Sequence, residues 1–134
     1  MTLYVDASAL AKRYVDEADS DQAESLLLSD RSWATGRHTY VEVCLALHRR
    51  LGEAELRIAR EGFERDWRRL LVIAVDDAVC RRAAELGAMT GSRTLDALHL
   101  AAVERVGARS VPIVTFDLRL AQAARSVGFR VLGT

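Results

Sequence analysis

The sequence has few cysteines, one proline and a single lysine. Its two cysteines, Cys44 and Cys80, lie in apolar patterns with helical spacing, so we expect buried free thiols in a reducing compartment rather than disulfides. No close pair of cysteines or histidines has the spacing of a zinc site. Pro112 is the only proline, and no Pro/Gly-rich linker divides the chain. These absences exclude a disulfide-stapled protein, and they favour one domain over residues 1–134.

Long apolar runs and an excess of charge are also missing. No stretch is apolar for long enough to span a membrane. The first residues have neither the basic start nor the apolar run of a signal peptide, so we expect a cytoplasmic protein. Lys+Arg and Asp+Glu both number 19. This balance gives no direct sign of nucleic-acid binding, which would need a local basic patch or metal ions at an acidic site.

Apolar runs and helical spacing alternate along the chain. The predicted strands are residues 3–5, 32–34, 71–75 and 113–116, with a possible edge strand at 130–132. The predicted helices are residues 7–15, 20–29, 39–51, 53–69, 77–89, 94–106 and 118–126. The run at 71–75 is apolar throughout, as buried parallel strands are. The alternation predicts an α/β fold, with a central parallel sheet of four to five short strands flanked by helices.

Two of the predicted helices carry apolar stripes. In the helix at 39–51 the residues at helical spacing are Val41, Cys44, Leu45 and His48. In the helix at 53–69 they are Leu56, Ala59, Phe63 and Trp67. We expect each stripe to face the protein interior.

Four acidic residues occupy equivalent positions in this pattern. Asp6 and Asp117 each follow a strand directly, and Glu42 and Asp96 each lie in the first turn of a helix. The carboxyl ends of parallel strands share one edge of the sheet, and α/β folds bind ligands there. We therefore expect the four carboxylates to converge at that edge, although they are far apart in the sequence.

Such a cluster predicts a bound cation. Grouped carboxylates repel one another and are costly to bury, so a positive charge must compensate. Oxygen ligands favour Mg²⁺ or Mn²⁺ over zinc, and these ions clamp phosphate oxygens and activate water for attack. Ser8 and Thr115 add hydroxyls that can hold a carboxylate or a water in place. This is the chemistry of nucleases and of some phosphatases.

Helix capping is the alternative interpretation of each acid taken singly. Carboxylates at helix N-termini are favoured by roughly 0.3–1 kcal/mol. Asp6 and Asp117 are suitable N-cap residues, and residues 39–42 match the capping-box pattern. Capping alone does not explain the residues that flank the four acids.

Four segments resemble the motifs of one protein family. Residues 6–14 (DASALAKRY), directly after the first strand, resemble the opening of PIN-domain ribonucleases, and most closely the toxins of VapBC-type toxin–antitoxin pairs. Residues 39–43 (TYVEV), 93–102 (RTLDALHLAA) and 114–120 (VTFDLRL) match the later motifs in the same order. The resemblance covers the whole chain, and the length of the chain agrees with that of the family.

The resemblance implies a PIN-like three-layer fold and a metal-dependent endoribonuclease. Asp6, Glu42, Asp96 and Asp117 would be its catalytic and metal-binding residues, with Mg²⁺ or Mn²⁺ bound and a metal-activated water attacking the RNA phosphodiester. The choice of RNA comes from the resemblance alone, because this chemistry does not need a 2′-hydroxyl. The resemblance further implies a type II toxin that forms a homodimer and binds a cognate antitoxin protein.

Basic residues flank these motifs and are candidates for RNA binding. Phosphate contacts would come from arginine and lysine near the acidic edge, and solvated surface charge is the alternative. The candidates are Lys12, Arg13, Arg37, Arg93 and Arg119.

The histidines are expected to be structural. His99 lies on the helix of Asp96 as a packed or solvent-facing residue, His38 in a loop, and His48 in packing.

Two other functions fit parts of the pattern. A receiver- or phosphatase-like phosphoryl-transfer protein also places acids at this edge, but it needs a lysine late in the chain, and Lys12 is the only one. A non-catalytic PIN-fold binding module would usually have lost an acid, and here all four are present.

Overall fold

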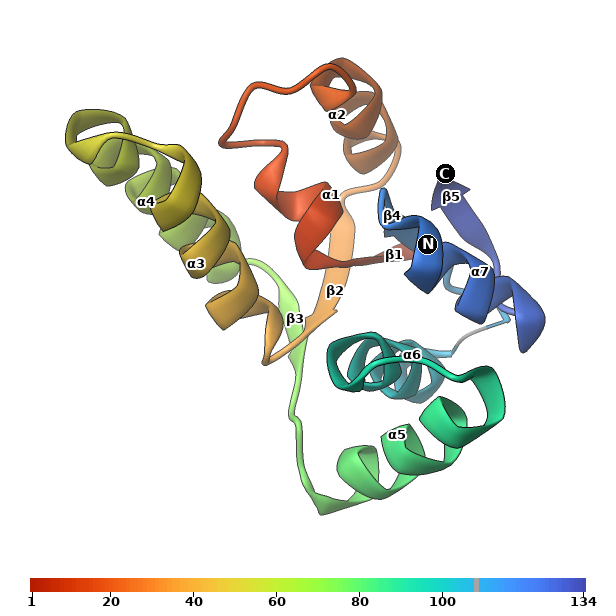
Figure 1. Cartoon of the computed structure of the whole chain (residues 1–134). Coiled ribbons are helices and arrows are strands. Elements are labelled where there is room, and N and C mark those ends of the chain that lie inside the picture. Colours follow the sequence, from red (N-terminus) through yellow and green to blue (C-terminus); the bar gives the residue numbers. More distant parts are fainter. Residues whose placement is uncertain (108) are drawn as a thin grey trace.

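The computed structural model describes residues 1–107 and 109–134 and contains a five-stranded parallel sheet (Figure 1). The strands are β1 (Thr2–Val5), β2 (Ser32–Gly36), β3 (Leu71–Ile73), β4 (Ile113–Thr115) and β5 (Val131–Gly133), in the spatial order β3-β2-β1-β4-β5. The helices are α1 (Ala7–Ala11), α2 (Ser20–Leu28), α3 (Thr39–Arg50), α4 (Glu53–Trp67), α5 (Asp77–Thr90), α6 (Thr94–Val106) and α7 (Leu118–Ser126). The predicted α/β class, with a parallel sheet between helices, is confirmed.

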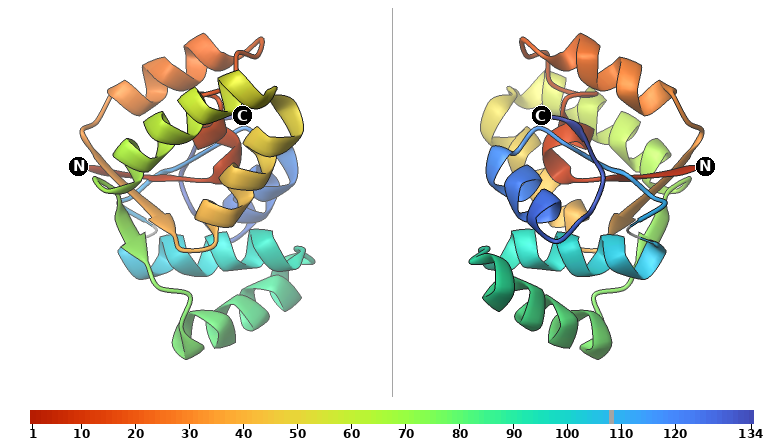
Figure 2. Two further views of the ribbon diagram at one scale, coloured as in Figure 1. Left: turned by 90° about the vertical axis from the view of Figure 1, so that its left-hand side faces the viewer. Right: turned by 90° about the vertical axis from the view of Figure 1, so that its right-hand side faces the viewer.

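The helices cover both faces of the sheet. Side chains alternate along a strand, so Leu3 and Val5 of β1 face one core and Tyr4 faces the other. The first core is closed by helices α1 to α4, and the second by α5, α6 and α7. Figure 2 shows α5 and α6 on one side of the sheet, with α2 and α4 on the other. The result is three layers, with parallel strand ends at one edge.

The strand predictions were right in position and partly wrong in burial. The run predicted at 71–75 forms a strand only over Leu71–Ile73, at an edge of the sheet. Leu71 is 56% exposed, so the expectation of a fully buried strand was wrong. The weaker pattern around Trp33 forms β2, an interior strand whose last three residues are buried. Strand order decides burial, and the local run of apolar residues does not reveal that order.

The stripe predicted for α3 was also wrong. Val41 and Leu45 are exposed, at 58% and 45%, and His48 is exposed as well. The helix instead buries Thr39, Val43 and Leu47. The predicted and the observed buried residues both fit helical spacing. The observed set was missed because it begins with a polar residue, Thr39.

The stripe on α4 is confirmed, since Ala59 and Phe63 are buried with Leu56 and Trp67 half-buried. The cysteine prediction was only partly right. Cys44 is half-buried, but Cys80 is exposed. Both are free thiols. In the described part of the chain, no helix has the length and hydropathy needed to cross a bilayer.

Candidate active site

Asp6 follows β1 directly and lies in a pocket of hydrogen-bond donors. The residue is 3% exposed. Oδ1 accepts the backbone N–H of Ala9 at 2.9 Å, and Oδ2 accepts the hydroxyl of Thr115 at 2.6 Å. The Ser8 hydroxyl lies 2.8 and 2.9 Å from the two oxygens. Asp6 is therefore a helix cap, as the alternative interpretation required, but only one of its three donors belongs to capping.

Ser8 and Thr115 also join β1, α1 and β4 at this edge. Val5 pairs with Val114 in the parallel register, so the next residue of each strand falls at the same level. The Ser8 oxygen accepts the backbone N–H of Phe116 at 2.9 Å, and the Thr115 oxygen accepts that of Asp117 at 3.0 Å. Both hydroxyls therefore have the supporting position that the sequence predicted for them.

Burial makes the Asp6 charge costly. Burial raises the pKa of the Asp6 carboxyl above its ordinary value, and the nearby His99 with the donors from Thr115, Ala9 and Ser8 offsets part of that rise. No lysine, arginine or histidine of the described residues forms an ion pair with this carboxylate. A buried carboxylate with donors but no cation is suited to bind one.

Asp96 and Asp117 lie at the N-terminal ends of α6 and α7. Asp96 is 8% exposed, and Arg93 approaches it at only 3.9 Å. Burial raises the pKa of Asp96, the negative charges of Asp117 and Glu42 raise it further, and Arg93 and nearby His99 act in the opposite direction. The charges of Asp117 and Glu42 are therefore close enough to act on Asp96.

Asp117 serves as the N-cap of α7. Its Oδ1 accepts the backbone N–H groups of Arg119 and Leu120 at 2.9 and 3.3 Å. Oδ2 takes part in neither of these bonds. A capping role therefore leaves one oxygen of this carboxylate for another ligand.

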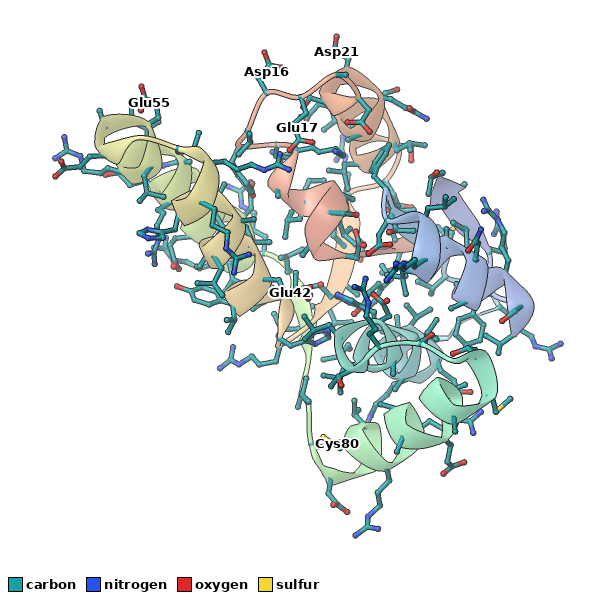
Figure 3. All side chains as sticks on the ribbon, viewed as in Figure 1. Asp16, Glu17, Asp21, Glu42, Glu55 and Cys80 are labelled. Carbon is teal, nitrogen blue, oxygen red and sulfur yellow. The ribbon has the colours of Figure 1, made fainter. Side chains whose placement is uncertain are left out.

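Glu42 is held by a histidine rather than by a capping box. Its Oε1 lies 2.8 Å from Nε2 of His99 and 3.7 Å from Nε2 of His38. His38, not Thr39, is the N-cap of α3, so the capping-box interpretation of Glu42 was wrong. Figure 3 shows Glu42 at the end of α3 that approaches α6, apart from the labelled acids Asp16 and Glu55 at the top of the view.

His99 is a buried link between the sheet and Glu42. Its Nδ1 lies 2.8 Å from the hydroxyl of Tyr4, which itself accepts the backbone N–H of Gly36 at 3.1 Å. Burial raises the pKa of Tyr4, so its hydroxyl keeps its proton and can donate to Nδ1. The Nε2–H of His99 then donates to Glu42. Of the two predicted positions for His99, packed or solvent-facing, the structure shows the packed one. Its hydrogen-bond chain was not predicted.

The charges of Asp117 and Glu42 act on Asp96, but in the part of the chain that the structure describes no three of the four acids bring donor atoms within 4.8 Å of one another. Among the described residues, the set of three possible metal ligands whose donor atoms all lie within 4.8 Å of one another is His38, Glu42 and His99. Of the four acids, Asp6 and Asp96 are the buried ones. Carboxylate oxygens are the ligands that Mg²⁺ and Mn²⁺ prefer, so the donor set fits a hard divalent cation.

The candidate RNA-binding residues separate into two groups. Lys12 and Arg13 are engaged in ion pairs inside the chain, Lys12 with Glu17 at 2.7 Å and Arg13 with Asp66 at 3.1 Å. The other candidates are exposed: Arg37, Arg93 and Arg119.

A groove of about 340 Å³ lies between α1 and α3, lined by Ser8, Glu42 and Arg49 among others. Arg49 is exposed. Sequence reasoning missed it because it lies outside every motif.

The chain matches known proteins over nearly its whole length. A family model described as PIN domain matches residues 3–126. Ribonuclease VapC46 of Mycobacterium tuberculosis is 32% identical, with 97% of this chain and 95% of that protein covered. The crystal structure of VapC20 from the same organism, described as a Sarcin-Ricin loop cleaving toxin, has a TM-score of 0.75 at 22% identity and covers 95% of each chain.

A toxin–antitoxin complex from Klebsiella pneumoniae is also similar in fold, with a TM-score of 0.66 at 15% identity over 86% of each chain. The family model and the VapC46 match cover the motifs that the sequence displayed. This chain belongs to the PIN-domain family.

Proposed function

We propose that this protein is an endoribonuclease that hydrolyses RNA phosphodiester bonds with a divalent cation, and that it is the toxin of a VapBC-type pair. The observation that carries the proposal is the pair Asp6 and Asp96. Both carboxylates are almost fully buried at the strand-end edge, and burial raises the pKa of each. A cation would relieve that cost. The similarity to a VapC ribonuclease supports RNA as the substrate.

Each acid has a distinct place in the proposed site. Asp6 and Asp96 are the principal ligands, Glu42 binds the cation or orients the attacking water, and Asp117 contributes its Oδ2. Mg²⁺ or Mn²⁺ suits this oxygen set. The bound ion would polarise the phosphate oxygens and activate a water for in-line attack.

The remaining side chains hold these acids in position. Ser8 and Thr115 keep both oxygens of Asp6 oriented through hydrogen bonds. His99 holds Oε1 of Glu42, and Oε2 takes no part in that bond. Supporting bonds of this kind are what a metal site requires of its surroundings.

Exposed arginines beside the edge supply the RNA contacts in this proposal. Arg93 precedes α6, Arg119 lies in the first turn of α7, and Arg37 precedes α3. Arg49 extends the basic surface along the groove that Glu42 lines. Lys12 and Arg13 contribute less, because their charges are already paired. Arginine suits this task because its planar fork matches a phosphate.

The partner proteins are part of the same proposal. A cognate antitoxin would inhibit the enzyme by placing an arginine among the acids, where a charge-assisted pair is strong. The toxin–antitoxin complex among the structural neighbours supports such a partner. We also propose that the protein is cytoplasmic and has a single domain, and that two copies of it form a homodimer. Light scattering of the purified protein would test the homodimer.

An RNA cleavage assay tests the proposed function. The wild type should cut RNA with Mg²⁺ or Mn²⁺ and stop in EDTA, and Asp96→Asn should lower the rate at least about a hundredfold, as loss of a catalytic ligand does. Asp21→Asn, at an exposed acid of α2, is the matched control and should keep full activity. Cleavage that persists in EDTA would contradict the proposal. Release of phosphate from acyl phosphates with RNA intact would favour the phosphoryl-transfer alternative.

A further inference from the structure

Three possible metal ligands meet beside the acidic edge. The ring nitrogens of His38 and His99 and a carboxylate oxygen of Glu42 all lie within 4.8 Å of one another. The distances from Glu42 Oε1 are 3.7 Å to His38 Nε2 and 2.8 Å to His99 Nε2. The two imidazole rings lie 4.2 Å apart between centroids. The set therefore converges on one small volume from the N-cap and first turn of α3 and from α6.

His38 is the unexplained member of the set. Its side chain is only 10% exposed, yet neither ring nitrogen has a hydrogen-bond partner among the described residues. An unpaired buried polar group destabilises the folded state, and buried groups of this kind are rare in native proteins. Nothing in the acid-based function uses this imidazole. A ligand bound to it would remove the cost.

We propose that His38, Glu42 and His99 form a binding site for one Zn²⁺-like transition-metal cation, which shares only Glu42 with the Mg²⁺ or Mn²⁺ site of the acids. Zinc binds nitrogen at about 2.0–2.1 Å and carboxylate oxygen at about 2.0–2.2 Å in a tetrahedron, which separates its ligands by about 3.3–3.5 Å. The observed 3.7 and 2.8 Å lie on either side of that range. Small side-chain movements would complete the geometry, with the fourth position open to water.

The donor types select this class of metal. Imidazole nitrogen suits zinc, copper and nickel, whereas magnesium and calcium take oxygen ligands. Two of the three donors here are imidazoles, whereas the four motif acids offer only oxygen. The two sites therefore prefer different ions, although they share Glu42.

Tyr4 supplies the outer contact that a zinc-binding histidine needs. Histidines that bind a metal through one nitrogen keep the other in a hydrogen bond, and Nδ1 of His99 already lies 2.8 Å from the Tyr4 hydroxyl. Metal binding at Nε2 would move the ring proton to Nδ1. A tyrosine hydroxyl both donates and accepts, so this contact persists in either tautomer.

Because both sites use Glu42, binding of Zn²⁺ should affect binding of Mn²⁺; this consequence rests on the proposed function. A Zn²⁺ ion held by the two histidines would engage Glu42, and the acidic edge would lose one of its four carboxylates. The same protein would then bind Mn²⁺ less tightly when Zn²⁺ is present.

Titration with Co²⁺, a spectroscopic substitute for Zn²⁺, tests the site without RNA. Metal-free full-length protein should bind about one equivalent of Co²⁺ with the strong visible absorption of four- or five-coordinate cobalt, and Zn²⁺ should abolish that band. His38→Ala and His38→Gln should each weaken Co²⁺ binding at least tenfold while circular dichroism confirms folding. His48→Ala, at the exposed histidine of the same helix, should bind as the wild type does.

Two results would overturn the proposal. One is the weak spectrum of six-coordinate cobalt, and the other is unchanged binding in both His38 variants. Asp96→Asn separates this site from the proposed function: it should keep the cobalt band and lose Mn²⁺ affinity. A failure of the ribonuclease proposal would leave the cobalt result intact, because the titration measures metal binding alone.

Discussion

Thr115 Oγ1 lies 2.6 Å from Asp6 Oδ2, across 109 residues of sequence. This bond joins the ends of two adjacent parallel strands, β1 and β4. It also gives the most buried of the four acids a fixed orientation before any cation binds. Preorganisation of this kind is what a metal site needs, because the ligands must be held in place by bonds of their own.

Thr115→Val removes this donor while keeping the side-chain shape. Loss of a hydrogen bond to a charged group should lower the free energy of unfolding by about 1.5–3 kcal/mol at neutral pH. Urea denaturation measures the change. Thr94→Val, at an exposed threonine in the first turn of α6, is the control and should change stability by less than about 0.5 kcal/mol. Equal effects of the two changes would show that the Asp6 bond contributes nothing.

Asp96→Asn should raise the melting temperature of the metal-free protein by a few degrees at pH 7. Burial, with the charges of Asp117 and Glu42, raises the folded-state pKa of Asp96 above 3.8, against the opposing effects of Arg93 and His99. The folded state then holds its proton more tightly than the unfolded state, so stability falls as pH rises through and above 3.8. Asparagine removes that penalty.

Calorimetry across pH measures this effect. The difference in melting temperature between Asp96→Asn and the wild type should grow from acid to neutral pH, and Mn²⁺ should raise the melting temperature of the wild type more than that of the variant. A variant that melts below the wild type at every pH would contradict the burial argument.

Tyr4→Phe should break the hydrogen-bond chain that holds Glu42. The change leaves Gly36 N–H and His99 Nδ1 without their partner, which should cost about 1–3 kcal/mol of stability. Tyr40→Phe removes a hydroxyl that bonds Glu64 between α3 and α4, away from His99, and serves as the control. The NMR chemical shifts of the His99 ring report the specific effect. They should move in Tyr4→Phe and stay in place in Tyr40→Phe.

Arg93→Ala should weaken RNA binding and flatten its dependence on salt. Each phosphate contact contributes roughly 0.7 to the slope of log affinity against log salt for a single strand, so losing one contact should reduce the slope by about that amount. Arg49→Ala tests the groove in the same way. Arg81→Ala, on the exposed face of α5, should leave both affinity and slope unchanged. Binding that is identical across salt concentrations would remove Arg93 from the RNA surface.

Much of the fold could be read from the sequence because its signals are local. The helix α6 was predicted over the residues that form it, since its apolar pattern ends at Gly107, where φ is 125°. The positions of Asp6 and Asp117 followed from parallel topology, in which strand ends share an edge. Ser8 and Thr115 were placed correctly because they flank these acids.

Other features depend on contacts between distant residues. Leu71 reads as a core residue, yet strand order places β3 at an edge. The sequence could not show whether Val41 or Val43 lies on the buried face of α3, because each belongs to a set of residues with helical spacing. The partners of His99 lie 95 and 57 residues away in sequence. Spacing along one helix cannot reveal such partners.

Binding of Mn²⁺ to the RNA-free protein tests the central claim most directly. Electron paramagnetic resonance measures free Mn²⁺ during titration of the wild type, Asp96→Asn and the control Asp21→Asn. Our account predicts that Asp96→Asn lowers affinity at least about tenfold, since even outer contacts of a metal site have effects of that size, while Asp21→Asn binds as the wild type does. Equal affinity in all three proteins would contradict it.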